Sequence, residues 1–467
     1  MNYLLHHDLQ NIVALAEETL SLTKDHFARQ SSLPPGRYVE DLIMENLPEK
    51  GLGAQEVLSY FKEKYSNKLS HSAGPRYFGF VTGGSTPAAM LGDQLVSLYD
   101  QNAFGSNDSI APQVERQTIH FLKQLFSLDE GYFGTFVTGA TMSNFVSLAI
   151  GRQWIGEQLG IDITNEGVFN VPVTVVSAAP HSSILKSMSM LGIGKKNIIK
   201  IDTLPDREAI DNKKLETYLQ SSTTPVIVVA NAGTVNTVDF DDLQALGALK
   251  KKYNFWLHVD AAFGGFAALS PDYAHLMEGI NYADSITIDA HKWLNVPYDA
   301  AMQFTRRKDL QLKVFQNSAA YLGDPNSSPD YFHYTPENSR RWRALPSWFT
   351  LMAYGKEGHR EIVERNCRLA KKLGDWIYAS EAYTLLAPVR MNVVCFTVEE
   401  GKSIEGIKSF LDRIRDDGRV YFTPTVYKGV PAIRAALSNW QTEEEDISLV
   451  IEVLKEMIPS NDNRTVI

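Results

Sequence analysis

The stretches FWLHVDAAFGG, residues 255–265, and SITIDAHKW, residues 285–293, decide the fold of this chain. Each begins with a short, mostly apolar run, which is the pattern of a strand buried on both faces. Each run gives way at once to polar residues, Asp260 in the first stretch and His291 and Lys292 in the second. Buried strands that end in chemically active residues are typical of an α/β protein whose ligand site lies at the carboxyl ends of the strands.

The same rhythm continues on both sides of these stretches, from about Thr135 to Thr305. Short β-branched runs alternate there with helical periodicity, which predicts a mainly parallel central sheet covered by helices on both faces. The predicted strands are Thr135–Val137, Val173–Val176, Pro225–Ala230, Phe255–Val259 and Ser285–Ile288. Because parallel strands share one carboxyl edge, the residues that follow these runs are expected to converge.

The length of 467 residues predicts more than one folded unit, because single hydrophobic cores stop growing near roughly 250–300 residues. Residues 1–75 are predicted to form a helical arm, residues 76–374 a large cofactor-binding domain, and residues 375–467 a smaller α+β domain. Helices are expected at Val39–Met44, Ala54–Tyr65 and Trp348–Gly374. The segment Gly323–Arg340 has no periodicity and is rich in Pro, Asn, Asp and Ser, which is typical of a functional loop.

Charge and cysteine content exclude several classes of partner. The 45 Lys and Arg against 55 Asp and Glu give a formal charge of −10 without a basic run, which argues against nucleic acid. Cys367 and Cys395 form no metal-spaced cluster, so no metal site is expected and a reducing, cytoplasmic compartment is favoured. Charged residues interrupt Met1–Leu20, which argues against a signal peptide or a membrane span there.

The functional prediction depends on Asp260 and Lys292. They are 32 residues apart (292 − 260) and follow neighbouring predicted strands. Singly, such an aspartate is more often a helix cap and such a lysine an exposed loop residue. Together they supply what pyridoxal 5'-phosphate (PLP) requires, an amine that condenses with its aldehyde and a carboxylate that keeps its ring nitrogen protonated. The sequence therefore predicts a PLP site with Lys292 as the covalent anchor.

Three further segments are candidates for the same crevice. Gly139–Thr141 precedes a predicted helix, Met142–Ile150, whose first N–H groups suit a phosphate, although such glycine turns are often only structural. His181 follows a predicted strand and is a candidate to lie on the ring or accept a proton, with helix capping as the alternative. Thr234 is a candidate to hydrogen-bond the cofactor or substrate, with turn capping as the alternative.

These motifs resemble those of the group II PLP-dependent decarboxylases, most closely the branch that contains aromatic L-amino-acid decarboxylase. The resemblance covers about residues 74–440, and its most specific parts are HVDAAFGG, residues 258–265, and DSITIDAHKWLNVPYDAA, residues 284–301. It implies the fold of the PLP-dependent transferases, aspartate aminotransferase-like fold type I. It also implies that Asp260 pairs with the pyridine nitrogen and that Lys292 forms an imine with the cofactor.

The resemblance assigns further residues around the cofactor. The segment TGAT, which includes Gly139, Ala140 and Thr141, is similar to the phosphate loop of these enzymes. By the same resemblance, Ala262 lies against the pyridine ring and His291 lies beside the phosphate.

Two more residues receive catalytic roles from the resemblance. APHSSI, residues 179–184, is similar to the segment whose histidine, here His181, stacks on the cofactor. SPDYFHYTPENSRRWRALPSW, residues 328–348, is similar to a flexible catalytic loop whose tyrosine, here Tyr331, returns a proton to the substrate Cα.

Two departures from the family concern the ligands. The expected substrate pocket includes Phe80, Val81 and Thr82, and the small Val81, Thr82 and Gly83 stand where DOPA-type decarboxylases are more aromatic. Asp289 stands where the aromatic enzymes often have Asn, which puts a carboxyl group near a dianionic phosphate.

The resulting expectation is an L-amino-acid decarboxylase that releases carbon dioxide and an amine, with an aromatic amino acid as one candidate substrate. The alternatives are an acidic or diamino acid as substrate, an aldehyde synthase in which oxygen intercepts the carbanion, and a non-catalytic PLP-fold binding protein. The presence of His181 and Tyr331 favours the amine-forming enzyme. The resemblance also implies a homodimer whose active site lies at the subunit interface.

Overall fold

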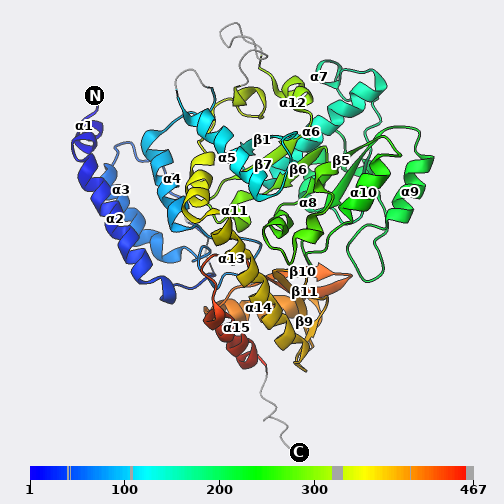
Figure 1. Ribbon diagram of the computed structural model, residues 1–467. Coiled ribbons are helices and arrows are strands. Elements are labelled where there is room, and N and C mark those ends of the chain that lie inside the picture. Colours follow the sequence, from blue (N-terminus) through cyan, green and yellow to red (C-terminus); the bar gives the residue numbers. More distant parts are fainter. Residues whose placement is uncertain (39–40, 43, 106–108, 318–329, 400, 459–467) are drawn as a thin grey trace, which may run out of the picture.

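The chain contains two sheets, a larger one in the middle of the molecule and a smaller one near the C-terminus (Figure 1). The computed structural model describes residues 1–38, 41–42, 44–105, 109–317, 330–399 and 401–458. The larger sheet contains β1 (Phe133–Val137), β2 (Val175–Ser177), β3 (Ile198–Lys200), β4 (Val226–Asn231), β5 (Phe255–Asp260), β6 (Ser285–Ile288) and β7 (Ala301–Thr305). The smaller sheet contains β8 (Tyr383–Leu385), β9 (Val393–Val398), β10 (Thr423–Tyr427) and β11 (Val430–Ala436).

The larger sheet has the strand order β1-β7-β6-β5-β4-β2-β3. The neighbours from β3 to β6 are parallel, whereas β7 runs antiparallel to both β6 and β1. The mainly parallel sheet is thus confirmed, and each of the five predicted strands is present within two residues of its predicted ends. The sequence did not predict β3, which is short and largely exposed, or β7, whose Gln303 interrupts the apolar run.

Alternate residues of the parallel strands point to opposite faces of the sheet and enter two separate cores. One core lies under α6 (Ala140–Leu159), α8 (Ser182–Met190) and α12 (Lys308–Phe315), and the other under α5 (Ala111–Leu125), α10 (Leu243–Lys250) and α13 (Ala344–Tyr378). Trp256 belongs to the first core, so the two-residue period also turns His258 and Asp260 toward α6. The site therefore forms between the end of β5 and the start of α6.

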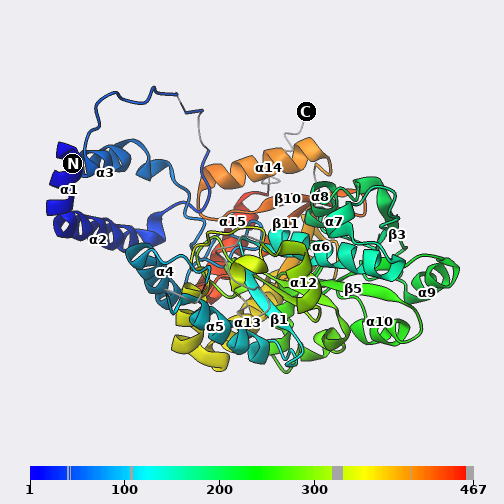
Figure 2. The ribbon, with the colours of Figure 1, turned by 90° about the horizontal axis from the view of Figure 1, so that it is seen from above.

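The N-terminal helices α1 (Tyr3–Gln10), α2 (Ile12–Ala28) and α3 (Ala54–Lys64) stand at the edge of the molecule, away from both sheets (Figures 1 and 2). None of their residues is buried. The predicted helix at Ala54–Tyr65 is confirmed. The predicted helix at Val39–Met44 is wrong for its described residues, which are not helical, because Leu42 and Met44 are exposed and find no apolar surface to cover.

The smaller sheet has the order β10-β11-β9-β8, and all of its strands are antiparallel. It shares a core with α14 (Ile404–Asp417), α15 (Glu444–Glu456) and the end of α13. The helix predicted at Trp348–Gly374 lies within α13, which crosses the predicted domain boundary at residue 374, and that boundary stays a prediction. Phe78, which precedes α4 (Pro87–Tyr99), donates to Tyr421 O at 2.9 Å, so this early segment is fixed to the smaller sheet.

The remaining described helices are α7 (Ile163–Glu166), α9 (Asn212–Ser221), α11 (Ala290–Trp293) and several short 3₁₀ turns. No helix in the described ranges is both long enough and apolar enough to cross a membrane. Cys367 and Cys395 are free and buried. The cytoplasmic location stays a prediction from the sequence.

Candidate active site

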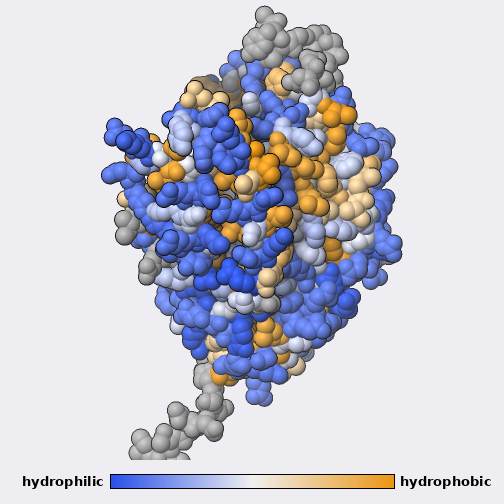
Figure 3. All heavy atoms as spheres, turned by 90° about the vertical axis from the view of Figure 1, so that its left-hand side faces the viewer, coloured by the Kyte–Doolittle hydropathy of each residue, from blue (hydrophilic) through white to orange (hydrophobic). Residues whose placement is uncertain are grey.

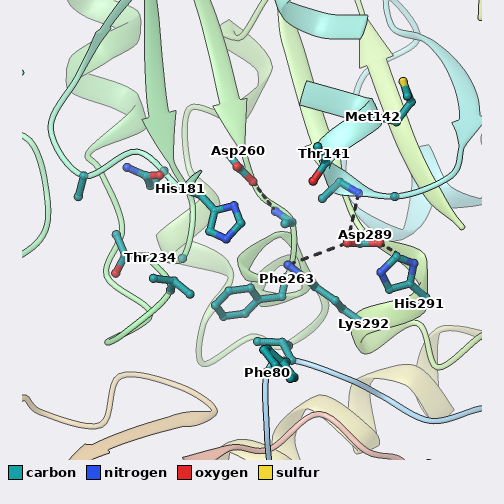
Figure 4. A pocket seen from close by; sticks show the side chains of 18 of the residues that line it. Phe80, Thr141, Met142, His181, Thr234, Asp260, Phe263, Asp289, His291 and Lys292 are labelled. Atoms are coloured by element: carbon teal, nitrogen blue, oxygen red, sulfur yellow. Dashed lines mark hydrogen bonds and ion pairs between the residues drawn. The ribbon is translucent and has the colours of Figure 1, made fainter. Parts of the chain in front are cut away.

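A cavity of about 410 Å³ lies at the carboxyl ends of β5 and β6, as the strand pattern predicted (Figure 4). Its walls come from the loops of the larger sheet, from the segment before α4 and from β11 of the smaller sheet. The structure brings most of the predicted site residues to this cavity: Phe80, Val81, Gly139, Ala140, Thr141, His181, Thr234, Asp260, Ala262, His291 and Lys292. Thr82 and Tyr331 are not among its lining residues.

Asp260 ends β5 and presents its carboxylate to the cavity with 7% of the residue exposed. Its Oδ2 accepts a hydrogen bond from Asn144 Nδ2 at 2.9 Å, and its Oδ1 accepts one from the Ala262 N–H at 3.2 Å. Hydrogen bonds to both oxygens stabilise the charged form of a buried carboxyl group. Asp260 is therefore a fixed negative charge that suits a protonated ring nitrogen.

Asn144 is itself held by a chain of side chains from β5 and β6. Trp256 Nε1 donates to Ser285 Oγ at 3.0 Å, and Ser285 Oγ lies 3.0 Å from His258 Nδ1. His258 Nε2 lies 2.9 Å from Asn144 Oδ1, so the chain is satisfied when Ser285 donates to Nδ1 and the imidazole carries its hydrogen on Nε2. Burial lowers the pKa of His258 to about 4, which keeps the ring neutral at neutral pH. The chain fixes the orientation of the amide that holds Asp260.

His181 caps α8 and also lines the cavity, so both of its predicted roles are compatible with the structure. Its Nδ1 accepts the Ser183 N–H at 3.3 Å and lies 2.8 Å from Ser183 Oγ, which in turn accepts from Asn144 Nδ2 at 3.0 Å. The hydrogen of the neutral ring is therefore on Nε2. Burial lowers the pKa of His181, and this also favours the neutral form.

Lys292 lies on the turn after β6, and Figure 4 shows it pointing into the same space as Asp260 and Asp289. Its Nζ is 4.0 Å from Asp289 Oδ2 and 5.3 Å from the centre of the Phe263 ring. An amine beside an aromatic ring and near a single carboxyl group is accessible to a carbonyl ligand in the cavity.

The N-terminus of α6 forms the other end of the cavity. Gly139 is its N-cap, and a Cβ there would come within 3.3 Å of His291 Cε1, so the glycine allows a close approach. The Ala140 N–H donates to Asp289 Oδ2 at 3.3 Å. The N–H groups at the start of a 20-residue helix suit a phosphate group.

Thr234 lines the cavity, but its hydroxyl is engaged within the turn. It donates to Glu208 Oε2 at 2.5 Å and accepts the Asp239 N–H at 2.9 Å. The turn-capping alternative for Thr234 therefore describes its contacts in this structure.

Tyr331 lies outside the cavity of its own chain. It is 2% exposed, its ring is 6.3 Å from that of Phe133 at the start of β1, and Arg340 lies 5.1 Å from the ring centre. Burial raises the pKa of Tyr331, and the nearby Glu115 adds to this shift. Much of the predicted loop at Gly323–Arg340 lies outside the described residues.

Sequence reasoning did not single out four cavity residues, Asn231, Val235, Phe263 and Arg434. Arg434 comes from β11, donates from Nη1 to Val235 O at 3.0 Å, and has no hydrogen-bond partner for Nε in the described part of the chain. Asn231 is paired in register with Asp260, and its buried Nδ2 likewise has no described partner. An arginine inside the apolar run of a strand was a signal that the sequence offered for Arg434.

Comparisons with known proteins agree with this geometry. Residues 35–399 match the family model described as the pyridoxal-dependent decarboxylase conserved domain. An aromatic-L-amino-acid decarboxylase of Bacillus atrophaeus is 27% identical and covers 94% of each chain. A 3,4-dihydroxyphenylacetaldehyde synthase of Aedes aegypti is also 27% identical, over 89% of this chain and 82% of the relative. The crystal structure of Oryza sativa TDC with PLP and tryptamine has a TM-score of 0.88 at 21% identity, over 96% of this chain and 97% of that one.

The residues present fit the cofactor that the family model names. The cavity has a carboxylate held by two donors, an accessible amine, a neutral imidazole and a helix N-terminus, and these match the ring nitrogen, the aldehyde, the ring face and the phosphate of PLP. No group of three or more His, Cys, Asp and Glu side chains in the described ranges is arranged to hold a metal ion. The family model spans most of the chain, so this protein belongs to the pyridoxal-dependent decarboxylases and is a carboxy-lyase with PLP as its cofactor.

Proposed function

We propose that this enzyme decarboxylates a free L-amino acid and releases the corresponding amine. The observation that carries the proposal is the placement of Asp260 and Lys292 at one cavity, which the neutral His181 also lines. When bound, PLP supplies a conjugated ring that accepts the electron pair left by the departing carboxylate.

At the cofactor site, each residue has one task in the proposal. Lys292 supplies the amine that anchors the cofactor and that yields its place to the amine of the substrate. Asp260 keeps a negative charge opposite the ring nitrogen, and Asn144 orients it. Ala262 and His181 lie against the pyridine ring of the cofactor. The phosphate is bound by Gly139, Ala140 and Thr141, beside His291.

Arg434 is the residue that we propose to bind the carboxylate of the substrate. It is a buried cation at the cavity, 7% exposed, and its Nε has no described partner. A desolvated guanidinium gains most from a ligand carboxylate, because burial lowers the pKa of Arg434 and a negative partner restores the stability of the charged form. The Nε2–H of His181 offers a second donor in the same cavity.

We propose an aromatic amino acid as the substrate class. Phe80 and Phe263 supply apolar surface to the cavity, and Val81 beside them leaves room for a ring. The cavity-lining carboxyl groups, Asp260 and Asp289, both belong to the cofactor site, and among the described residues Arg434 and Lys292 are the Lys and Arg side chains that line the cavity. An acidic or diamino side chain would therefore lack a dedicated partner there.

The proton that replaces carbon dioxide on Cα is assigned to Tyr331 in this proposal. Because Tyr331 is packed against β1 of its own chain, the assignment requires the loop that carries it to serve the cavity of a second copy.

The N-terminal arm supports a pairing of two copies of the chain. Its helices have no buried residue, and apolar side chains reach the surface on this side of the molecule (Figure 3). Exposed apolar residues of the arm include Leu5, Leu9, Ile12, Val13 and Leu20. We therefore propose a homodimer.

The experiment combines cofactor trapping with a substrate panel. Protein loaded with PLP is reduced with borohydride, digested and sequenced, and the adduct is expected on Lys292. Aromatic, acidic and diamino L-amino acids are then assayed for carbon dioxide, amine, aldehyde and peroxide. Equimolar carbon dioxide and amine from an aromatic substrate is the expected result, and aldehyde with peroxide as main products would replace the proposal by the aldehyde synthase.

The same assay tests the proton donor. Tyr331→Phe is expected to lower amine formation by about a hundredfold while the borohydride adduct at Lys292 remains. Unchanged amine turnover would remove Tyr331 from the reaction.

A further inference from the structure

The two carboxyl oxygens of Asp289 have different surroundings. Oδ2 accepts the Ala140 N–H at 3.3 Å and is 4.0 Å from Lys292 Nζ. Oδ1 has no hydrogen-bond donor among the described residues, although it lies 3.2 Å from His291 Nδ1. Only 2% of Asp289 is exposed, so Oδ1 has no access to water that would replace a protein donor.

The contact between Asp289 and His291 requires a proton. His291 Nδ1 accepts the Ala300 N–H at 3.3 Å, so this nitrogen carries a lone pair. An ionised Oδ1 would face that lone pair at 3.2 Å with no hydrogen between them. Burial raises the pKa of Asp289 and lowers the pKa of His291, and both shifts favour a hydrogen on the carboxyl group.

The charges around Asp289 come from three elements. His291 and Lys292 on α11 favour its ionised form, whereas Asp260 at the end of β5 opposes it. Tyr298, in the turn before β7, is neutral because burial raises its pKa to about 12. A dianionic phosphate at the start of α6 would add two negative charges next to Oδ2, so ionised Asp289 and the phosphate would repel one another.

We propose that Asp289 is a neutral acid when the phosphate of the cofactor is bound, with its carboxyl hydrogen on Oδ1 toward His291 Nδ1, so that it adds no negative charge beside the phosphate. The proton comes from solvent, and no covalent bond to carbon or phosphorus changes. An asparagine at this place is uncharged at every pH, whereas the aspartic acid is uncharged only while it holds its proton. Phosphate binding and protonation of Asp289 are thus coupled.

The test compares wild-type protein with Asp289→Asn, which keeps the shape of the side chain and cannot ionise. Both full-length proteins are titrated between pH 6.5 and 8.5 with PLP and with pyridoxal, which lacks the phosphate. Above the pKa of Asp289 in the free chain, wild-type affinity for PLP is expected to fall by about tenfold per pH unit relative to the variant. For pyridoxal, the pH dependence of the two proteins is expected to be the same.

Calorimetry in two buffers of different ionisation enthalpy counts the protons. At a pH at which Asp289 of the free chain is ionised, wild type is expected to take up about one more proton per PLP than Asp289→Asn, and no more per pyridoxal. Equal pH dependence and equal proton counts for PLP, at a pH at which Asp289 of the free chain is ionised, would overturn the proposal. Should Asp289→Asn fail to fold by circular dichroism, Asp289→Ser, which also cannot ionise, takes its place in both measurements. No substrate is present, so failure of the proposed decarboxylation does not affect the result.

Discussion

Asp260 and Asp289 lie at two ends of one cavity and are 7% and 2% exposed, yet the fold surrounds them differently. Each oxygen of Asp260 has a donor, and behind it a chain of side chains runs through Asn144 and His258 into the sheet. Among the described residues Asp289 has one hydrogen-bond donor, the Ala140 N–H, and its Oδ1 has none. The donors at the first end hold a negative charge where a cation is to bind. Their shortage at the second end favours a neutral acid where an anion is to bind.

The two ends of the cavity are expected to respond to acid in opposite ways. At the Asp260 end, His258 is held neutral, so acid adds a charge that the buried chain does not accommodate. At the Asp289 end, burial raises the pKa of the carboxyl group, so acid protonates Asp289 and gives the neutral form that the site favours. Lowering the pH is therefore expected to disturb the Asp260 end and to favour phosphate binding at the Asp289 end.

The largest effect is expected for Asp260→Asn, which removes the charge and keeps the shape. Amine formation should fall by roughly a thousandfold, because the ring nitrogen loses the anion that stabilises its positive charge during carbon dioxide release. Turnover is measured at saturating PLP, and the borohydride adduct at Lys292 serves as the control that the cofactor remains bound. Turnover within tenfold of wild type would show that the fixed charge at residue 260 is not needed.

The sequence predicted much of the Asp260 end of the cavity. Strand-ending residues after apolar runs indicated Asp260 and Lys292, and the parallel sheet that brings them together follows from the same runs. The two-residue period of Trp256, His258 and Asp260 was a signal for the buried chain, but its partner Asn144 lies on a helix more than a hundred residues earlier. A single sequence does not show which helix faces a strand.

The sequence predicted less of the Asp289 end. The sequence marked Asp289 as a departure from the family, but how its charge is offset depends on the orientation of the Ala140 and Ala300 N–H groups. Backbone orientation in a turn follows from the packing of the whole domain. The sequence did not predict the packing of Tyr331 against Phe133 at the start of β1, because these two residues are almost two hundred positions apart in the sequence.

A smaller effect is expected on stability in acid. The pKa of His258 is lowered from 6.5 in the unfolded chain to about 4 in the fold, so the unfolded chain binds more protons between these values. The stability that neutral His258 contributes to the fold is therefore fully present above pH 6.5 and is lost as the pH falls toward 4. Between pH 7.5 and 5 the loss from this residue should be about 2 kcal/mol.

The measurement is urea unfolding of wild type and His258→Gln at both pH values. The variant cannot titrate at this place, so its stability should fall less between pH 7.5 and 5 than that of wild type. His71 and His359, whose pKa values are also lowered to about 4 by burial, are unchanged in both proteins and cancel in the comparison. Equal losses in the two proteins would contradict a neutral His258.

The smallest effect is expected for Gly139→Ala at the phosphate end, with Gly265→Ala as the matched control. The added Cβ would lie 3.3 Å from His291 Cε1 at the first position and 3.3 Å from Ile288 Cδ1 at the second, and neither glycine needs a positive φ. Both neighbours are side-chain ends that shift slightly, so each variant should lose no more than about 1 kcal/mol of stability. Only at residue 139 does the shift move a group beside the phosphate. Affinity for PLP should therefore fall about threefold in Gly139→Ala and stay unchanged in Gly265→Ala, and equal affinities would mean that the His291 ring does not border the phosphate site.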